Sequence, residues 1–145
     1  MRNLASLILV LWAGALGAAT LEDRQLFEGS GGQTTLRVLS STDTDIFAPI
    51  LEGFLARNPA LNIDYAVAGS ADIVTLIDDC PDCFDVVISS AMDLQLKLAN
   101  DGVARPLSGL VGNTGSQWRQ SLFGFTLEPA TVVINRAAFE GRPVP

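Results

Sequence analysis

A strand-like run that ends in small polar residues and leads directly into a helix-like run occurs three times in this chain. The three copies are LRVLSSTDTDIFAPILEGFL, IDYAVAGSADIVTLIDD and DVVISSAMDLQLKLANDG, which begin at residues 36, 63 and 85. Strands that alternate with helices over short connections are typical of a parallel sheet covered by helices. The repeated junction therefore predicts an α/β fold with a mostly parallel sheet.

The spacing of apolar residues sets the bounds of the predicted elements. The leucines of LQLKL (94–98) would also fit a strand, but Gly102 and the good helix formers around them favour a helix. The almost wholly apolar run at 84–89 is typical of a central parallel strand. We expect strands at 36–40, 62–68, 84–89, 122–127 and 131–135, and helices after each of the first three. The first helix should end at RNP (57–59), and the second should span residues 70–79.

The three junctions predict a binding site. In a parallel sheet, ligands bind beyond the carboxyl ends of the strands, which is where all three junctions would lie. Helix starts present unpaired N–H groups and a partial positive charge, and hydroxyl side chains add donors and acceptors. We expect a small polar or anionic ligand there, bound by residues Ser41, Thr42, Gly69, Ser70, Ser89, Ser90 and Ala91.

Helix capping is the structural alternative for these residues, because Ser and Thr are ordinary N-caps. Thr42-x-x-Asp45 and Ser90-x-x-Asp93 each resemble a capping box with Asp in place of Glu. The aspartates at these junctions would also repel a nearby anion. Capping and ligand binding therefore remain alternative roles for the same hydroxyl groups.

The amino-terminal end predicts export. Residues 1–19 combine Arg2, an apolar run and the small residues Gly17-Ala18-Ala19, a pattern typical of a cleaved signal peptide, with a membrane anchor as the less favoured alternative. Residues 20–35 are polar and Gly-rich, which predicts a flexible lead-in. The net charge of -7 and the lack of a basic run argue against nucleic acid and anionic membranes as partners.

Cys80 and Cys83 are separated by two residues in CPDC, and an exported chain meets an oxidising environment. The motif follows a helix-like run and precedes a strand, the reverse of a thioredoxin-type site. We therefore expect a Cys80–Cys83 disulfide that closes a tight loop, and we favour it over a redox centre. Closing so short a loop should stabilise the fold by about 2 kcal/mol. A zinc site would need two more ligands.

Enzyme classes are disfavoured by what the sequence lacks. With no histidine, neither a Ser-His-Asp triad nor a His-ligated zinc centre can be built. Gly-x-Ser-x-Gly and Walker A patterns are absent as well. We expect no enzymatic activity, no cofactor and no metal site, and a secreted hydrolase is the less favoured alternative.

Three segments resemble a known family: VLSSTDTDIFAPILEGFLARNP, DVVISSAMDLQLKLANDGVARPL and WRQSLFGFTLEPATVVINRAAF. They are similar to the two-lobed, type II periplasmic substrate-binding proteins of ABC transporters, in the branch that binds iron(III), phosphoglycerate or sugar phosphates. The resemblance implies a periplasmic protein that delivers a small solute, such as a phosphorylated or carboxylated metabolite, to an inner-membrane ABC permease. A ligand-sensing adaptor for a membrane kinase and an iron(III) binder remain alternatives.

The resemblance also implies a division of the chain. Residues 36–128 match lobe one, Glu128-Pro129 match the hinge, and residues 129–145 match the hinge and first strand of an otherwise missing lobe two. Family members are much longer, so the sequence is interpreted as the amino-terminal portion of such a fold. Since two-lobed binders enclose a solute between both lobes, we expect this chain alone to bind weakly or not at all.

Overall fold

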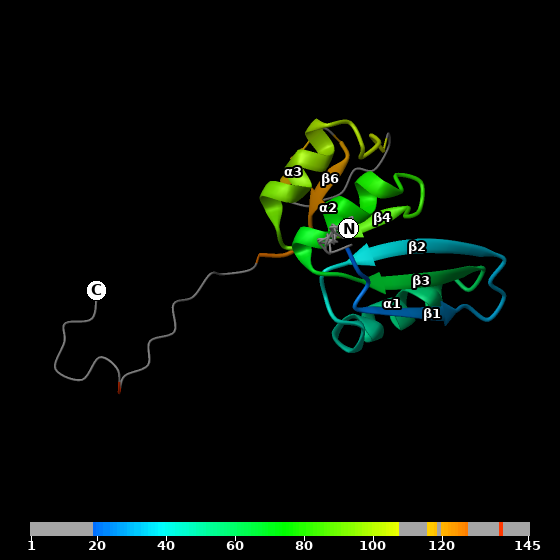
Figure 1. Ribbon diagram of the computed structural model, residues 1–145. Coiled ribbons are helices and arrows are strands. Elements are labelled where there is room, and N and C mark those ends of the chain that lie inside the picture. Colours follow the sequence, from blue (N-terminus) through cyan, green and yellow to red (C-terminus); the bar gives the residue numbers. More distant parts are fainter. Residues whose placement is uncertain (1–18, 108–115, 119, 128–136, 138–145) are drawn as a thin grey trace, which may run out of the picture.

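The computed structural model describes residues 19–107, 116–118, 120–127 and 137. Its main sheet has the strand order β1-β3-β2-β4, formed by β1 (Asp23–Glu28), β2 (Thr34–Ser40), β3 (Leu61–Val67) and β4 (Val86–Ile88). β2 is parallel to β3 and to β4, whereas β1 is antiparallel to β3. The arrows of β2 and β3 therefore point the same way in Figure 1 and that of β1 points back. The predicted α/β class is confirmed.

Three helices cover the two faces of this sheet, and each follows a parallel strand. They are α1 (Thr44–Arg57), α2 (Ser70–Asp79) and α3 (Met92–Asn100). In Figure 1, α1 lies on one side of the sheet and α2 and α3 lie on the other. α2 has the predicted bounds, α1 ends at the predicted RNP, and the helix favoured over a strand at 94–98 is present as α3.

The core consists of two clusters, one on each face of the sheet. The cluster under α1 is formed by bulky side chains: Phe27, Val38, Leu51, Leu55, Ile63, Tyr65 and Val67. The cluster under α2 and α3 contains two alanines and is formed by Leu39, Ala66, Ala68, Ile73, Ile77 and Leu98. The alternation along each strand sends successive side chains to opposite clusters, as a sheet covered on both faces requires.

A row of charged side chains continues the second face where α2 and α3 no longer cover it. Arg24 forms two hydrogen bonds with Asp64, at 2.9 and 2.6 Å, and Arg37 likewise forms a two-pronged pair with Asp85. The Arg24 hydrogen bond holds the pKa of Asp64 below its usual value, and the Arg37 hydrogen bond does the same for the pKa of Asp85. This half of the face is therefore polar and open to solvent.

The flexible lead-in expected at 20–35 is wrong in its central part, because Asp23–Glu28 form β1. Phe27 is buried at 7% exposure, and the whole strand pairs with β3. The turn after β1 packs closely against the next strand: a Cβ at Gly29 would lie 2.2 Å from the carbonyl oxygen of Leu61. Only glycine fits there, so the glycines that suggested mobility instead permit a tight turn.

Two other strand expectations differ from the structure. The run at 84–89 gives only the three residues of β4, which stands at one end of the described strand order rather than in its centre. The run at 122–127 gives β6 (Leu122–Gly124), which pairs antiparallel with β5 (Ser116–Trp118) in a separate two-stranded sheet. The expected signal peptide, hinge and 131–135 strand lie outside the described residues, apart from Ala19. In the described part of the chain, no helix has the length and hydropathy that crossing a membrane requires.

Candidate functional site

The carboxyl ends of the three parallel strands meet at one edge of the sheet. Ser40, the last residue of β2, stands opposite Val67 of β3 and opposite Ile88 of β4. The segments that follow these strands are therefore neighbours, and together they hold all of the residues predicted to bind a ligand. We call this edge, comprising residues 40–44, 68–72 and 88–94, the rim.

Backbone hydrogen bonds hold the rim together. The Ala68 N–H donates to the Ser40 carbonyl at 2.9 Å, and the Ser41 N–H donates to the Ile88 carbonyl at 3.0 Å. The segment after β2 thus bridges the segments after β3 and β4. The fully buried Ser40 hydroxyl accepts from the Thr42 N–H at 3.0 Å, which fixes the turn into α1. The rim is therefore built from three segments, of which the one after β2 is hydrogen-bonded to both of the others.

The helix starts at the rim are not capped by side chains. The N-cap residues are Asp43, Gly69 and Ala91, and none of the three makes a side-chain hydrogen bond to its helix. The capping boxes expected at Thr42 and Ser90 are wrong, since both helices begin later than those boxes require. In α1 the Ile46 N–H donates to the Asp45 carboxylate at 2.9 Å, and in α2 the Asp72 N–H donates to the Gly69 carbonyl at 2.9 Å. The N–H groups that the helix starts can offer a ligand at this edge are therefore those of residues 44–45, 70–71 and 92–94.

The predicted residues divide into those that face outward and one that supports the rim. Ser90 is exposed, and Ser41, Thr42, Gly69 and Ser70 are partly exposed. The Ser89 hydroxyl is used internally, because it accepts the Ala91 N–H at 3.1 Å.

Tyr65 is a buried support and not an exposed ligand group. Its side chain is fully buried, stacks on Phe47 and donates its hydroxyl to the Thr42 carbonyl at 2.9 Å. Burial raises the pKa of Tyr65 above its usual value, so the phenol stays protonated. The single tyrosine of the chain therefore has its hydroxyl engaged inside the fold.

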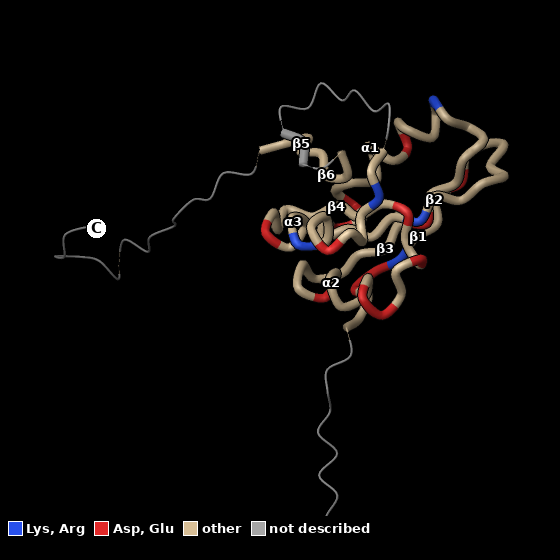
Figure 2. Tube along the Cα trace, turned by 90° about the horizontal axis from the view of Figure 1, so that it is seen from above, with Lys and Arg blue, Asp and Glu red and all other residues tan. Residues whose placement is uncertain are grey.

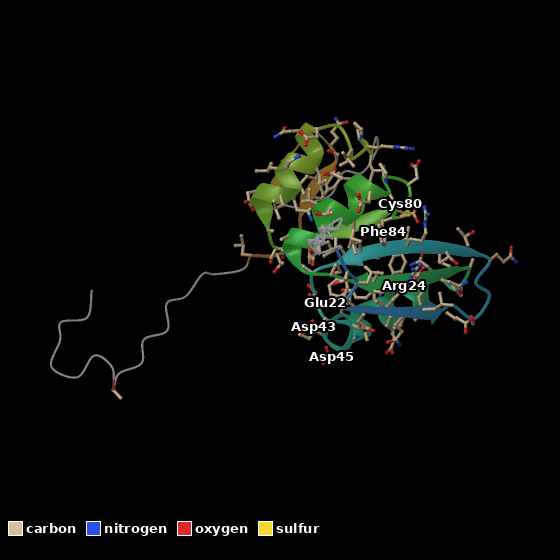
Figure 3. The ribbon with its side chains drawn as sticks, in the orientation of Figure 1. Glu22, Arg24, Asp43, Asp45, Cys80 and Phe84 are labelled. Carbon is tan, nitrogen blue, oxygen red and sulfur yellow. A yellow bond between two sulfur atoms is a disulfide. The ribbon has the colours of Figure 1, made fainter. Side chains whose placement is uncertain are left out.

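Carboxylates dominate the surroundings of the rim, and sequence reasoning missed two of them because they fall in the expected lead-in. A shallow pocket of about 400 Å³ lies where β1 begins beside the start of α1, and four of its lining residues are Glu22, Asp23, Asp43 and Asp45. Asp23 also accepts a hydrogen bond from the Thr44 hydroxyl at 2.6 Å, which ties β1 to the first residue of α1. Figure 3 shows Glu22, Asp43 and Asp45 close together at this edge.

Carboxylates also flank Gly69. A Cβ placed on Gly69 would lie 3.4 Å from a Glu22 carboxylate oxygen and 3.5 Å from one of Asp72. Asp93 adds a further carboxylate in the first turn of α3. Acidic groups therefore stand at all three segments of the rim.

Four of the five described cations are engaged in ion pairs of their own. Their partners are not rim carboxylates: the pairs are Arg24–Asp64, Arg37–Asp85, Lys97–Asp101 and Arg105–Asp82. The fifth, Arg57, is the last residue of α1 and so lies at the end of that helix opposite the rim. Figure 2 shows that acidic positions outnumber basic ones over the described chain. Among the described residues, no group of three or more His, Cys, Asp or Glu is arranged to hold a metal ion.

The sequence matches no family model and no curated protein. A solved structure does match: the crystal structure of the substrate binding protein of the ABC transporter from Agrobacterium tumefaciens, with 31% sequence identity and a TM-score of 0.71. The match covers 88% of this chain and 40% of that one, so this chain spans about two fifths of the length of that protein. The sheet with its flanking helices is thus the fold of part of a periplasmic binding protein.

Proposed function

We propose that this chain is the solute-binding part of an extracytoplasmic substrate-binding protein, which delivers a small solute to an ABC permease. The carrying observation is the rim: three uncapped helix starts at one edge of a sheet whose fold matches such a protein. Uncapped helix starts bind anionic or polar groups through backbone N–H donors, and hydroxyls such as that of Ser90 add further contacts.

The charges at the rim refine the proposed solute. A purely anionic phosphate or carboxylate would meet the N–H groups but would also be repelled by Glu22, Asp43 and Asp72. A solute that joins an anionic group to a positively charged amine satisfies both features, because each of its ends then faces the opposite charge. We therefore propose a small zwitterion that contains a carboxylate or a phosphoryl group. This choice keeps the phosphorylated or carboxylated metabolite expected from the resemblance and adds an amine.

Solute binding can be tested by NMR, because this chain alone is expected to bind weakly and chemical shifts report weak binding. The probes are inorganic phosphate, acetate, glycine and methylamine at matched ionic strength. We expect glycine to shift the backbone amides of residues 44–46, 70–72 and 92–94 at lower concentration than acetate or methylamine does. Equal responses to acetate and glycine would contradict the zwitterion, and shifts spread evenly over the chain would contradict the rim.

A matched pair of variants separates the rim from the rest of the surface. Ser90 and Ser30 are both exposed, but Ser90 lies at the rim and Ser30 lies in the turn after β1. Ser90→Trp should abolish the shifts caused by glycine, whereas Ser30→Trp should leave them unchanged. Equal binding by both variants would move the site away from the rim.

Delivery to a permease also requires export. We propose a periplasmic location, with cleavage of the predicted signal peptide after Ala19. Mass spectrometry of exported protein should then find Thr20 as the first residue. A chain that keeps its first residues and stays with the membrane fraction would contradict this proposal.

A further inference from the structure

The loop that joins α2 to β4 is held at several points to the strand beside it. Cys80 caps the end of α2 and is joined to Cys83 by a disulfide, as predicted from the sequence. The Cys83 N–H donates to the Cys80 carbonyl at 3.1 Å, so the disulfide closes one tight turn. We call residues 80–85 the clip.

Arg37 of β2 fastens the other side of the clip. Its guanidinium donates to the Asp82 carbonyl at 2.7 Å and to both carboxylate oxygens of Asp85, at 2.7 and 3.0 Å. Backbone bonds reinforce this contact, because the Arg37 N–H donates to Asp85 at 2.8 Å and the Asp85 N–H donates to the Arg37 carbonyl at 2.8 Å. The clip is thus closed within itself by the disulfide, directly after α2, and is fixed to β2 by hydrogen bonds.

β4 depends on the clip for its position. It has only three residues and, among the described strands, pairs only with β2. Val86 is 38% exposed, so little apolar burial retains this strand. Directly after β4 come Ser89 and Ser90 of the rim, and the Ile88 carbonyl accepts the bond from Ser41. A displacement of the clip would therefore be passed along three residues to the rim.

Cys83 is exposed, as are Pro81 and Asp82, which makes the disulfide accessible to a thiol. A dithiol would attack the Cys83 sulfur through its thiolate, and Cys80 would leave as a thiolate and take up a proton. The second thiol of the reagent would then release Cys83 and form the reagent's own disulfide. Two electrons pass from the dithiol to the protein, and both cysteines end as thiols.

We propose that the Cys80–Cys83 disulfide is a redox-sensitive clip, whose reduction by a dithiol loosens β4 and the rim segment 88–91. Reduction removes the covalent closure, and the hydrogen bonds to Arg37 must then hold a loop with greater conformational freedom. Loosening the rim segment would also weaken solute binding, and this consequence alone rests on the proposed function.

Hydrogen–deuterium exchange of the full chain, oxidised and after treatment with dithiothreitol, tests the clip directly and requires no solute. On reduction, we expect the exchange rate in residues 85–91 to rise about tenfold more than that in peptides from β1 and β3, whose smaller rise reports the lost loop-closure stabilisation of the whole fold. Cys80→Ser/Cys83→Ser should reproduce the reduced pattern with and without dithiothreitol. Dithiothreitol should change nothing further in that variant.

Two outcomes would overturn the proposal. Unchanged exchange in 85–91 after verified reduction would show that Arg37 alone fixes the clip. An equal increase in β1, β3 and 85–91 would show that the disulfide acts on global stability and not on β4. Because neither outcome involves solute, failure of the clip and failure of the proposed binding function can be told apart.

Discussion

The face of the sheet under α1 is apolar along its whole length, whereas the face under α2 and α3 is apolar only near the carboxyl ends of the strands. Every second residue of β3 from Leu61 to Val67 packs into the α1 cluster. On the other face, Ala66 and Ala68 contribute to the core and Asp64 instead joins the charged row. The α1 face therefore provides most of the burial, and the second face combines a smaller core with the clip and the charged pairs.

The largest expected contrast comes from two leucines with the same exposure. Leu51 on α1 and Leu98 on α3 are each 5% exposed. Leu51→Ala should lower the free energy of unfolding by about 4 kcal/mol, because its bulky neighbours keep the new cavity open. Leu98→Ala should lower it by about 2 kcal/mol, because the smaller cluster around it can collapse into the space. Urea unfolding of both variants measures the difference, and equal losses would contradict the contrast between the faces.

Enlarging a small residue tests whether the second face is closely packed. Ala66 is 1% exposed beneath α2 and α3. Ala66→Leu should lower the free energy of unfolding by roughly 2 kcal/mol, because an overfilled core shifts its neighbours. Ala56→Leu, on the exposed side of α1, is the matched control and should change stability by less than about 0.5 kcal/mol. A stable Ala66→Leu variant would reveal unused space on this face.

Tyr65→Phe removes one hydroxyl from the α1 face and keeps its packing. The loss of the bond to the Thr42 carbonyl should cost about 1 kcal/mol in the free energy of unfolding. Hydrogen exchange should also become faster at residues 42–46, since the turn into α1 loses its support. Unchanged exchange there would mean that Ser40 alone holds the turn.

The charged row should produce the smallest effect, and one that depends on pH. The folded-state pKa of Asp64 is lowered by Arg24, so its stabilising contribution is present above the unfolded-state pKa and is lost as pH falls through the folded one. At pH 7, Asp64→Asn should cost less than about 1 kcal/mol, because the pair is partly exposed. The difference from the unaltered protein should vanish near pH 2, and a difference that persists in acid would contradict an ionic origin.

The parallel sheet was predictable because each of its helices and strands carries its own periodicity. Ser70–Asp79 was predicted with its observed bounds because Gly69 and the cysteine loop mark both of its ends. β1 was not predictable in the same way, since five of its six residues are exposed and only Phe27 enters the core. A strand of this kind is held by pairing with β3, a long-range contact that leaves no local pattern.

The rim was predictable in position but only partly in charge, because the aspartates at the junctions are visible in the sequence and the carboxylates that β1 adds are not. The rule that helix starts follow the ends of parallel strands located Ser41, Ser70 and Ser90 correctly at one edge. The sequence could not show that Glu22 would approach Gly69, because that contact depends on the antiparallel pairing of β1. For the same reason the sequence favoured an anionic solute, and the fold adds carboxylates that such a solute would have to face.

The direction of β1 has a practical consequence for labelling. Because this strand runs against its neighbours, its first residue, Asp23, stands opposite Val67, the last residue of β3. A fluorophore or affinity tag attached at Thr20 would therefore begin within a few residues of the edge where solute is proposed to bind. Attached at Ser30, at the far end of the same strand, it would stand a strand's length away. The first position suits a reporter of binding, and the second suits immobilisation that leaves binding undisturbed.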